Sequence, residues 1–314
     1  MDYIDNIYVI NMDRSKDRLE QMKKQVPKMG RPFTRIPAID GRKLTNDQIK
    51  ALSTPLCSTF CTPSMIGCYL SHLKALQAVV DNGDRYAIIM EDDCELVDTF
   101  AGDIQDIFRE SVSPDFVYLG CFGGCDYENK YSLFTQFVTL LMPKLPKTDP
   151  VAYKNLYVPG APLGFHCYMV SNRCAKELLK RLGKANFHVD VAFLSSSNGL
   201  EVYATKRKLG YQFTNAEQST QSTSTFPIII NDILDCLEDE NRVRGSFYFR
   251  SPFFQIGFHP INLYTICLGL LTIWFPDLVL AYLLTELILS PNNLGVITFH
   301  VIMCLAVIYI RIRK

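Results

Sequence analysis

Three consecutive acids, Glu91, Asp92 and Asp93, follow the apolar run of the segment RYAIIMEDDCEL. The run is typical of a buried strand, and like charges at its end repel one another. Side chains alternate along a strand, so Glu91 and Asp93 are predicted to face one way and Asp92 the other. Two carboxylates on one face can share a divalent cation, and hard oxygen ligands suit Mg²⁺ or Mn²⁺. Ligands of open α/β sheets also bind beyond the carboxyl ends of strands. An acidic loop start without a ligand is the alternative.

The clearest predicted helix lies directly before this strand. Thr62 fits an N-cap and Pro63 suits the first helical position. Apolar residues then recur at alternating spacings of three and four, which predicts one buried stripe: Ile66, Tyr69, Leu73, Leu76 and Val80. The tripeptide Asp-Asn-Gly at 81–83 predicts the end of the helix. A helix that leads into a buried strand is the unit of an α/β sheet, so this fold class is predicted.

Other predicted elements fit the same class. Strands are expected where β-branched and aromatic residues cluster, at 6–12, 114–121, 164–170, 200–205 and 211–215. A charged helix follows the first strand, and the segment SNRCAKELLKRLG predicts a capped helix with Gly183 directly after it. Residues 126–158 show no clear period and are expected to form a surface excursion. The polar run at 217–225 indicates a loop or linker.

The chain becomes far more apolar after Arg250. Residues 261–289 carry only two acids, and residues 294–310 carry no Asp, Glu, Lys or Arg. A bilayer core needs about 20 apolar residues, so a membrane-associated helical hairpin is predicted, with its turn at 290–293. Basic residues flank the hairpin on both sides, which predicts that both ends and the catalytic region face the cytoplasm. A buried apolar subdomain, or a hairpin that lies in the membrane interface, is the alternative.

Composition excludes some classes of partner. Lysine plus arginine equals aspartate plus glutamate, 32 each, and no basic stripe carries interleaved aromatic residues, so nucleic-acid binding is not expected. The first residues lack the pattern of a secretory signal. The 11 cysteines are therefore expected to be free thiols in a reducing compartment. The pairs Cys57/Cys61 and Cys121/Cys125 lack a matching second pair or a histidine cluster, which disfavours zinc.

The motifs resemble those of glycosyltransferase family 25, which includes lipopolysaccharide-modifying and collagen galactosyltransferases. The block from Gly67 to Asp93, which pairs GC-x-x-SH with EDD, is the specific part. The segments VINMDRSKDRLE, RIPAIDGRKL, DFVYLG and GFHCYMVSNRCAKELLKRL support it. The resemblance implies a GT-A-type domain, with a Rossmann-like mixed sheet, that binds a nucleotide sugar, often UDP-galactose, and a divalent metal, usually Mn²⁺. We expect this domain at 1–225, a juxtamembrane linker at 226–257 and the hydrophobic hairpin at 258–314.

The resemblance also implies roles for the acids. Asp93 would bind the metal, Glu91 would contact the ribose or the metal, and Asp92 would support the turn. A bound cation neutralises the charge that develops on a nucleoside diphosphate as it leaves. His166, in the segment GFHCY, matches a histidine of many bacterial members and would be a further metal ligand, although the threonine that precedes it there is missing. A histidine packed in the core is the alternative.

The family is described as inverting, which requires one base to deprotonate the acceptor hydroxyl. Asp190, in the segment NFHVDV, is the candidate base, and His188 is the second choice. An aspartate at this place could equally cap a helix or strand.

Four other residues match the family pattern beside the donor. Arg14 and Arg18 follow the first strand and would meet the diphosphate or hold the first loop; a solvated helix face is the alternative. Asp40 belongs first to a turn and second to the donor site. His72 would line the donor site, or would support the structure of its helix.

The expected function is metal-dependent transfer of a hexose, most simply galactose from UDP-galactose. The acceptor would be a hydroxyl of a glycan, a lipid-linked sugar or a protein. A catalytically inactive, membrane-tethered nucleotide-sugar-binding or scaffold protein is one alternative, against which the intact EDD and HVD segments argue. A metal-dependent phosphohydrolase is another, but it would need more clustered Asp and His ligands than the chain carries.

Overall fold

The chain folds into two compact units in a computed structural model, Met1–Ser58 with Pro63–Phe213 and Thr59–Thr62 with Thr214–Lys314. The structure describes residues 1–110, 113–125, 127–128, 136, 139–145, 153–212, 227–235, 245–257, 259–289 and 294–313. The predicted linker at 217–225 and the predicted turn at 290–293 lie outside these residues.

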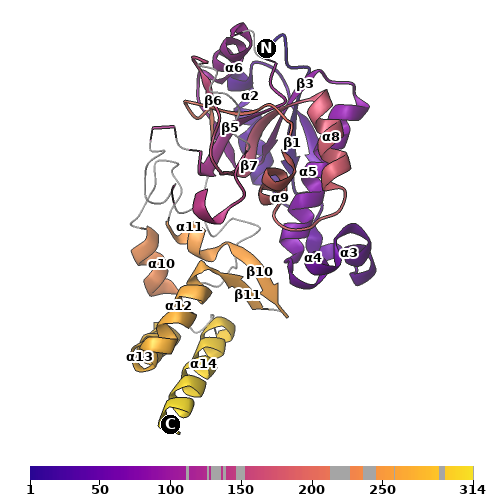
Figure 1. The fold of residues 1–314 in the computed structure, drawn as a ribbon. Coiled ribbons are helices and arrows are strands. Elements are labelled where there is room, and N and C mark those ends of the chain that lie inside the picture. Colours follow the sequence, from indigo (N-terminus) through magenta and orange to yellow (C-terminus); the bar gives the residue numbers. More distant parts are fainter. Residues whose placement is uncertain are drawn as a thin grey trace. The chain divides into compact units, whose positions relative to one another are not determined.

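The first unit contains a seven-stranded mixed sheet (Figure 1). Its order is β2 (Thr34–Pro37), β1 (Asn6–Asn11), β3 (Tyr86–Glu91), β7 (Pro162–Ser171), β5 (Phe116–Gly123), β8 (Val202–Thr205) and β6 (Leu156–Tyr157). Strand β1 runs parallel to β2 and β3, whereas β7 is antiparallel to both β3 and β5. Strand β5 is parallel to β8, to which β6 pairs antiparallel. The predicted α/β class is confirmed.

Two expectations differ at the ends of this sheet. The excursion predicted at 126–158 contributes β6 near its end, so it is not wholly a surface loop. The strand predicted at 211–215 begins earlier, as β9 (Gly210–Gln212), which pairs antiparallel with β4 (Cys94–Leu96). Its later residues lie outside the described part.

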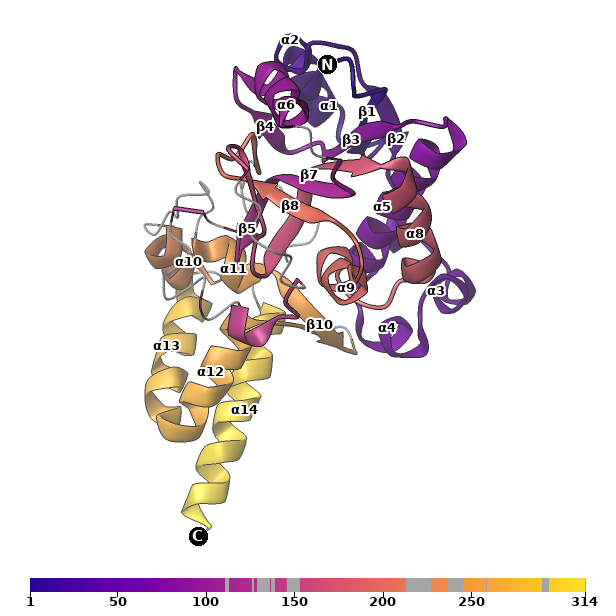
Figure 2. The same ribbon diagram turned by 45° about the horizontal axis from the view of Figure 1, so that its top comes forward.

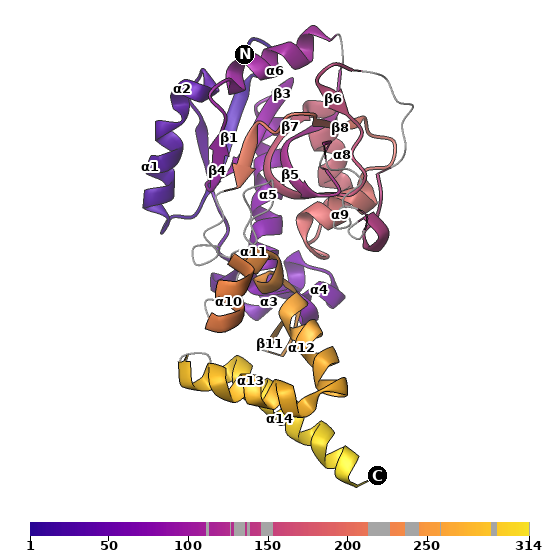
Figure 3. The same ribbon diagram turned by 90° about the vertical axis from the view of Figure 1, so that its left-hand side faces the viewer.

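Helices cover both faces of the sheet, and the alternation of strand side chains divides the core between them. One apolar cluster contains the strand residues Ile7, Val9, Ile88 and Met90. Three helices also contribute side chains to it: α1 (Lys16–Lys24), α2 (Val26–Met29) and α6 (Phe100–Arg109). Figure 3 shows α1 and α2 along this side of the strands. On the other face, α5 (Pro63–Asp81) packs on β1, β2 and β3, while α8 (Asn172–Leu182) and α9 (Val189–Ser196) pack on β7 (Figure 2).

Helix α5 begins at Pro63 and ends at Asp81, as predicted, but its buried face is rotated from the predicted stripe. Leu73 and Val80 are half-buried, whereas Ser71 and His72 are fully buried. The close approach of α5 to a short 3₁₀ segment, Gly41–Lys43, explains part of the rotation. The backbone at this place leaves no room for a side chain on the helix at position 67, which is a glycine. A Cβ atom at Gly67 would lie 2.5 Å from a backbone carbonyl oxygen. Helices α3 (Asn46–Leu52) and α4 (Pro55–Phe60) lie between the two in sequence.

The second unit is mainly helical. It contains α10 (Ile228–Asp235), α11 (Gly245–Arg250), the antiparallel pair β10 (Pro252–Ile256) and β11 (His259–Asn262), α12 (Leu263–Trp274), α13 (Pro276–Leu289) and α14 (Leu294–Ile312). Helices α12, α13 and α14 pack on one another around Leu268, Val279, Leu283 and Cys304.

The prediction of a hairpin of two membrane-associated helices is therefore wrong for the first of them. Two helices, α12 and α13, stand in its place. Pro276 is the cause, since proline excludes helical geometry from the residue before it and favours the first position of a new helix. Phe275 accordingly has a φ of −133°. None of the described helices is both long and apolar enough to cross a bilayer.

The expectation that all cysteines are free thiols is also wrong. Cys121 and Cys125 form a disulfide at the end of β5, and Cys57 and Cys61 are disulfide-bonded as well. Disulfides persist mainly in oxidising compartments. Disulfide bonding therefore removes the free thiols as an argument for a cytoplasmic location, which stays a prediction.

Candidate functional site

The three acids lie at the carboxyl end of β3, beside the end of β1. Strand β3 ends at Glu91, so the alternation of side chains stops there. Contrary to the prediction, Asp92 does not point away from Asp93. Both carboxylates instead contact the guanidinium group of Arg18, whose NH1 atom lies 3.0 Å from Asp92 Oδ1 and 3.5 Å from Asp93 Oδ2. Asn11, the last residue of β1, donates to Asp92 Oδ2 at 2.7 Å. Asp92 thereby fixes the turn, and Arg18 holds the acids together.

Asp93 carries the least compensated charge of the cluster. Its side chain is 12% exposed, and its Oδ1 atom is buried and accepts no hydrogen bond from the residues that the structure describes. Its Oδ2 atom accepts a long hydrogen bond from Gln212, at 3.3 Å. Burial and the neighbouring charge of Glu91 raise the pKa of Asp93 to about 7. A hard divalent cation would satisfy this buried oxygen. Asp93 and His166 do not, however, belong to the group of potential ligands that lie within 4.8 Å of one another among the described residues.

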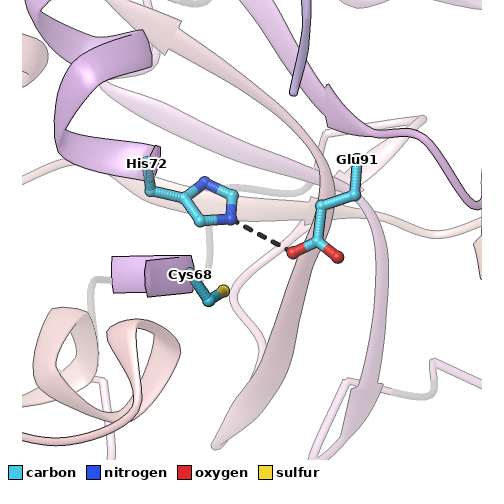
Figure 4. A group of neighbouring side chains, drawn as sticks. All are labelled: Cys68, His72 and Glu91. Carbon is cyan, nitrogen blue, oxygen red and sulfur yellow. Dashed lines mark hydrogen bonds and ion pairs between the residues drawn. The ribbon is translucent and has the colours of Figure 1, made fainter. Parts of the chain in front are cut away.

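Glu91 differs from Asp93 in its electrostatics. Burial acts to raise the pKa of Glu91, but a hydrogen bond from His72 and the charges of neighbouring groups outweigh burial and lower it. The atoms Glu91 Oε1 and His72 Nε2 lie 3.1 Å apart (Figure 4). The other ring nitrogen, Nδ1, lies 3.1 Å from the hydroxyl of Tyr168. Burial and the charge of Glu91 therefore disfavour the ionised form of Asp93, whereas the hydrogen bond with His72 favours the ionised form of Glu91.

His166 lies on β7 within electrostatic reach of Glu91. Its Nε2 atom lies 3.3 Å from the carbonyl oxygen of Gly210, and its buried Nδ1 atom has no hydrogen-bond partner among the described residues. Burial lowers the pKa of His166 to about 4, so the ring is neutral at neutral pH. A Cβ atom at Gly120 would lie 2.4 Å from His166 Nε2, so glycine is required there. A neutral, partly unpartnered imidazole is suited to metal ligation.

Asp190 lies in the first turn of α9 and connects this helix to β7. Its Oδ2 atom accepts a hydrogen bond of 2.8 Å from the backbone N–H of Gly164, and its Oδ1 atom accepts one of 2.9 Å from Val191. Gly164 stands two residues before His166 on β7. His188, the second predicted base, is the N-cap residue of α9.

Arg14 and Asp40 form an ion pair with each other. Asp40 also caps the 3₁₀ segment, accepting from the backbone N–H of Arg42. Since β1, β2 and β3 are parallel, the loops that hold these residues follow the same edge of the sheet as the acids. Arg18, in contrast, is paired with the acids and is half-buried.

Sequence reasoning missed four members of the site: Asn11, Cys68, Tyr168 and Gln212. Asn11 had a detectable signal, because a polar residue at the carboxyl end of a strand is exceptional among apolar neighbours. Cys68 also had one, since it stands one helical turn before His72. Tyr168 and Gln212 come from distant segments, and no local pattern marks them.

Comparison with known proteins places these residues in a family. The family model of glycosyltransferase family 25 (LPS biosynthesis protein) matches residues 4–193, which include the acids, His72, His166 and Asp190. The chain is 27% identical over 128 residues to procollagen galactosyltransferase 1 of Danio rerio and to procollagen galactosyltransferase 2 of Mus musculus. It is 29% identical over 128 residues to inactive glycosyltransferase 25 family member 3 of Homo sapiens.

These alignments cover 37% of the chain and 20–22% of the relatives, so the chain matches about a fifth of the length of these curated proteins. The family match is broader, because it extends over more than half of the chain and contains the whole acid cluster at the end of β3. The chain therefore belongs to glycosyltransferase family 25.

Proposed function

We propose that this chain is a metal-dependent glycosyltransferase with a GT-A-type domain, which transfers a hexose from a nucleotide sugar to a hydroxyl group. The observation that carries the proposal is the carboxylate of Asp93. It is buried beyond the carboxyl end of a strand, its pKa is raised to about 7, and one oxygen lacks a donor. A structural acid would be expected to have its hydrogen bonds completed.

In this proposal Asp93, Glu91 and His166 hold the divalent ion, Mn²⁺ or Mg²⁺. The ion supplies positive charge that stabilises the departing diphosphate. The chain's own residues prepare the site: Arg18 holds Asp92 and Asp93 together, and Asn11 fixes Asp92. The pKa of Glu91 is lowered, which keeps this ligand ionised, since its hydrogen bond and the surrounding charges outweigh its burial.

Asp190 is the proposed base that removes the acceptor proton. Each of its oxygens accepts one backbone N–H, which leaves lone pairs that can accept a proton and fixes the direction of the carboxylate. UDP-galactose is the proposed donor, because two of the relatives are named galactosyltransferases. Arg14 and Asp40, in loops that follow the same edge of the sheet, are proposed donor contacts.

A second candidate is a member of the family without catalytic activity. The observation that favours it is that relatives named inactive or probably inactive match this chain at 27–29% identity, as the galactosyltransferases do. Overall similarity thus does not separate the two functions. Asp93 favours the active function, because one oxygen of this carboxylate has no hydrogen-bond donor among the described residues, while Arg18 and Gln212 contact the other.

The test uses the full chain with a panel of UDP- and GDP-sugars, each with and without Mn²⁺. Wild-type protein, Asp93→Asn and the control Asp98→Asn are compared, since Asp98 is an exposed acid five positions away with its side chain 90% exposed. We expect one donor to be consumed only with the metal. Asp93→Asn should lower its consumption at least 100-fold, and Asp98→Asn should change it less than twofold. If no donor is consumed or bound with any metal, the inactive function replaces the transferase.

The helices α12, α13 and α14 are proposed to attach the protein to a membrane surface. Many of their large apolar side chains are exposed, including Trp274, Leu278, Ile288 and Ile312. Exposed apolar residues beside basic ones are typical of segments that lie in the lipid interface, and Arg311 is exposed near the end of α14.

Flotation of the full chain with vesicles of neutral and of anionic phospholipid tests this attachment. The double variant Leu278→Glu/Ile288→Glu should reduce flotation at least tenfold. Leu56→Glu, at an exposed leucine of α4, is the control. Wild-type protein that stays with neither kind of vesicle would contradict the attachment.

A further inference from the structure

Three potential metal ligands of different chemistry converge between α5 and the end of β3. The Cys68 thiol, a ring nitrogen of His72 and a carboxylate oxygen of Glu91 all lie within 4.8 Å of one another. Cys68 and His72 stand one turn apart on the same face of α5, and Figure 4 shows all three side chains directed toward a common point. We propose that Cys68, His72 and Glu91 form a binding site for a thiophilic divalent cation, Zn²⁺, in addition to the ion held by Asp93.

The spacing of the three atoms suits such an ion. Zinc binds thiolate sulfur at about 2.3 Å and imidazole nitrogen or carboxylate oxygen at about 2.0–2.2 Å. In tetrahedral geometry these bonds separate the ligand atoms by about 3.3–3.8 Å. His72 Nε2 and Glu91 Oε1, now 3.1 Å apart, need to separate by only a few tenths of an ångström, and Cys68 needs to approach by at most about one ångström.

The surroundings of His72 prepare it as a ligand. A metal-bound histidine normally donates its second ring N–H to a fixed acceptor, which orients the ring. Tyr168 provides that acceptor, with its hydroxyl oxygen 3.1 Å from His72 Nδ1, and both side chains are buried. To bind the ion, the ring carries its proton on Nδ1, which donates to the Tyr168 hydroxyl. Nε2, which is within hydrogen-bond distance of Glu91 without an ion, then provides its lone pair to the metal in place of that hydrogen bond.

The donor set selects the class of ion. A thiolate and an imidazole favour zinc over Mn²⁺ and Mg²⁺, which prefer oxygen ligands. Three protein ligands leave a fourth position for water. Cys68 and Glu91 are half-buried, so an ion can reach the site from solvent. The site thus differs in chemistry from the oxygen-rich surroundings of Asp93, although Glu91 belongs to both.

The inference can be tested without sugar donor or acceptor, so its failure is distinguishable from failure of the proposed function. The full chain is stripped with a chelator and titrated with Co²⁺, whose thiolate complexes absorb in the near ultraviolet, and then with Zn²⁺. The variants are Cys68→Ser, His72→Gln and Tyr168→Phe. The control is Cys267→Ser, at a half-buried cysteine of α12 outside any disulfide.

We expect one of the Co²⁺ ions bound by each chain to produce a thiolate band, and Zn²⁺ to abolish that band. The band should persist in Cys267→Ser and vanish in Cys68→Ser, and affinity should fall 10–100-fold in His72→Gln and about tenfold in Tyr168→Phe. X-ray absorption of the zinc-loaded wild type should show one sulfur at about 2.3 Å. This measurement needs no variant to fold. A wild-type protein with no thiolate band, or a band that survives in Cys68→Ser, would overturn the proposal.

Discussion

Replacing Asp93 by asparagine is expected to stabilise the metal-free first unit at pH 8. The gap between the raised pKa of Asp93, about 7, and its ordinary value of 3.8 corresponds to about 4 kcal/mol. This is an upper limit, because Asp93 interacts with the other two acids and the variant also loses the 3.5 Å contact with Arg18. We expect a net gain of about 2–3 kcal/mol in the free energy of unfolding.

The gain should depend on pH in one direction. Below about pH 4 the carboxyl group is protonated in the folded and unfolded states alike, so asparagine brings no advantage. Between about pH 4 and pH 7 only the unfolded state is ionised, so folding takes up a proton and the stability of the wild type falls as the pH rises. Above the raised pKa of Asp93, about 7, the full difference is present.

Hydrogen exchange of the β3 and β7 amides, measured by mass spectrometry with a chelator present, reports on the first unit separately. Protection is compared at pH 5 and pH 8 after correction for intrinsic exchange. About two-fifths of the gain should be present at pH 5, and the control Asp98→Asn should change stability by less than about 0.5 kcal/mol. A loss of stability in Asp93→Asn at pH 8, or a gain that is the same at both pH values, would refute the reasoning.

Four other substitutions, one of them a control, probe the scaffold and the proposed base. Asp115→Ala should lower the free energy of unfolding by about 3 kcal/mol in denaturant titrations, because this buried carboxylate accepts hydrogen bonds from a backbone N–H and a serine hydroxyl. A loss of less than about 1 kcal/mol would contradict its structural role. Gly67→Ala should cost about 2 kcal/mol, since its Cβ would lie 2.5 Å from a carbonyl oxygen, whereas Gly102→Ala, in open space on a helix, should gain up to about 1 kcal/mol; equal effects would argue against the close approach. Asp190→Asn should lower kcat at least 100-fold with the KM for donor unchanged, and residual activity above a tenth would exclude it as the base.

Much of the fold could be predicted from the sequence because its signals are local. The apolar runs of β1, β3, β5 and β7 mark buried strands, and the caps of α5 and α8 mark helix boundaries. The order of the strands could not be predicted, since β7 enters between β3 and β5 by antiparallel pairing that no local pattern encodes. The break at Pro276 was visible in the sequence, but the continuous apolar run concealed it.

The site was predictable in part for the same reason. The acids are contiguous in sequence, so Glu91 and Asp93 could be identified as a cluster. Their partners could not, because Arg18 reaches them from 74 positions away and Gln212 from 119. The burial of His72 was also hidden, since a histidine beside a serine reads as polar surface until the rotation of α5 is known.

The edges of the sheet have a consequence for self-association. The outermost strands of the described sheet are β2, with four residues, and β6, with two. Pro37, at the end of β2, has no backbone N–H to donate. An edge recruits strands from other chains through its row of unpaired N–H and C=O groups. The longest strand, β7, with ten residues, is enclosed on both sides. Because β7 lies in the interior of the sheet, the strand with the most backbone groups for pairing is not available for edge-to-edge aggregation.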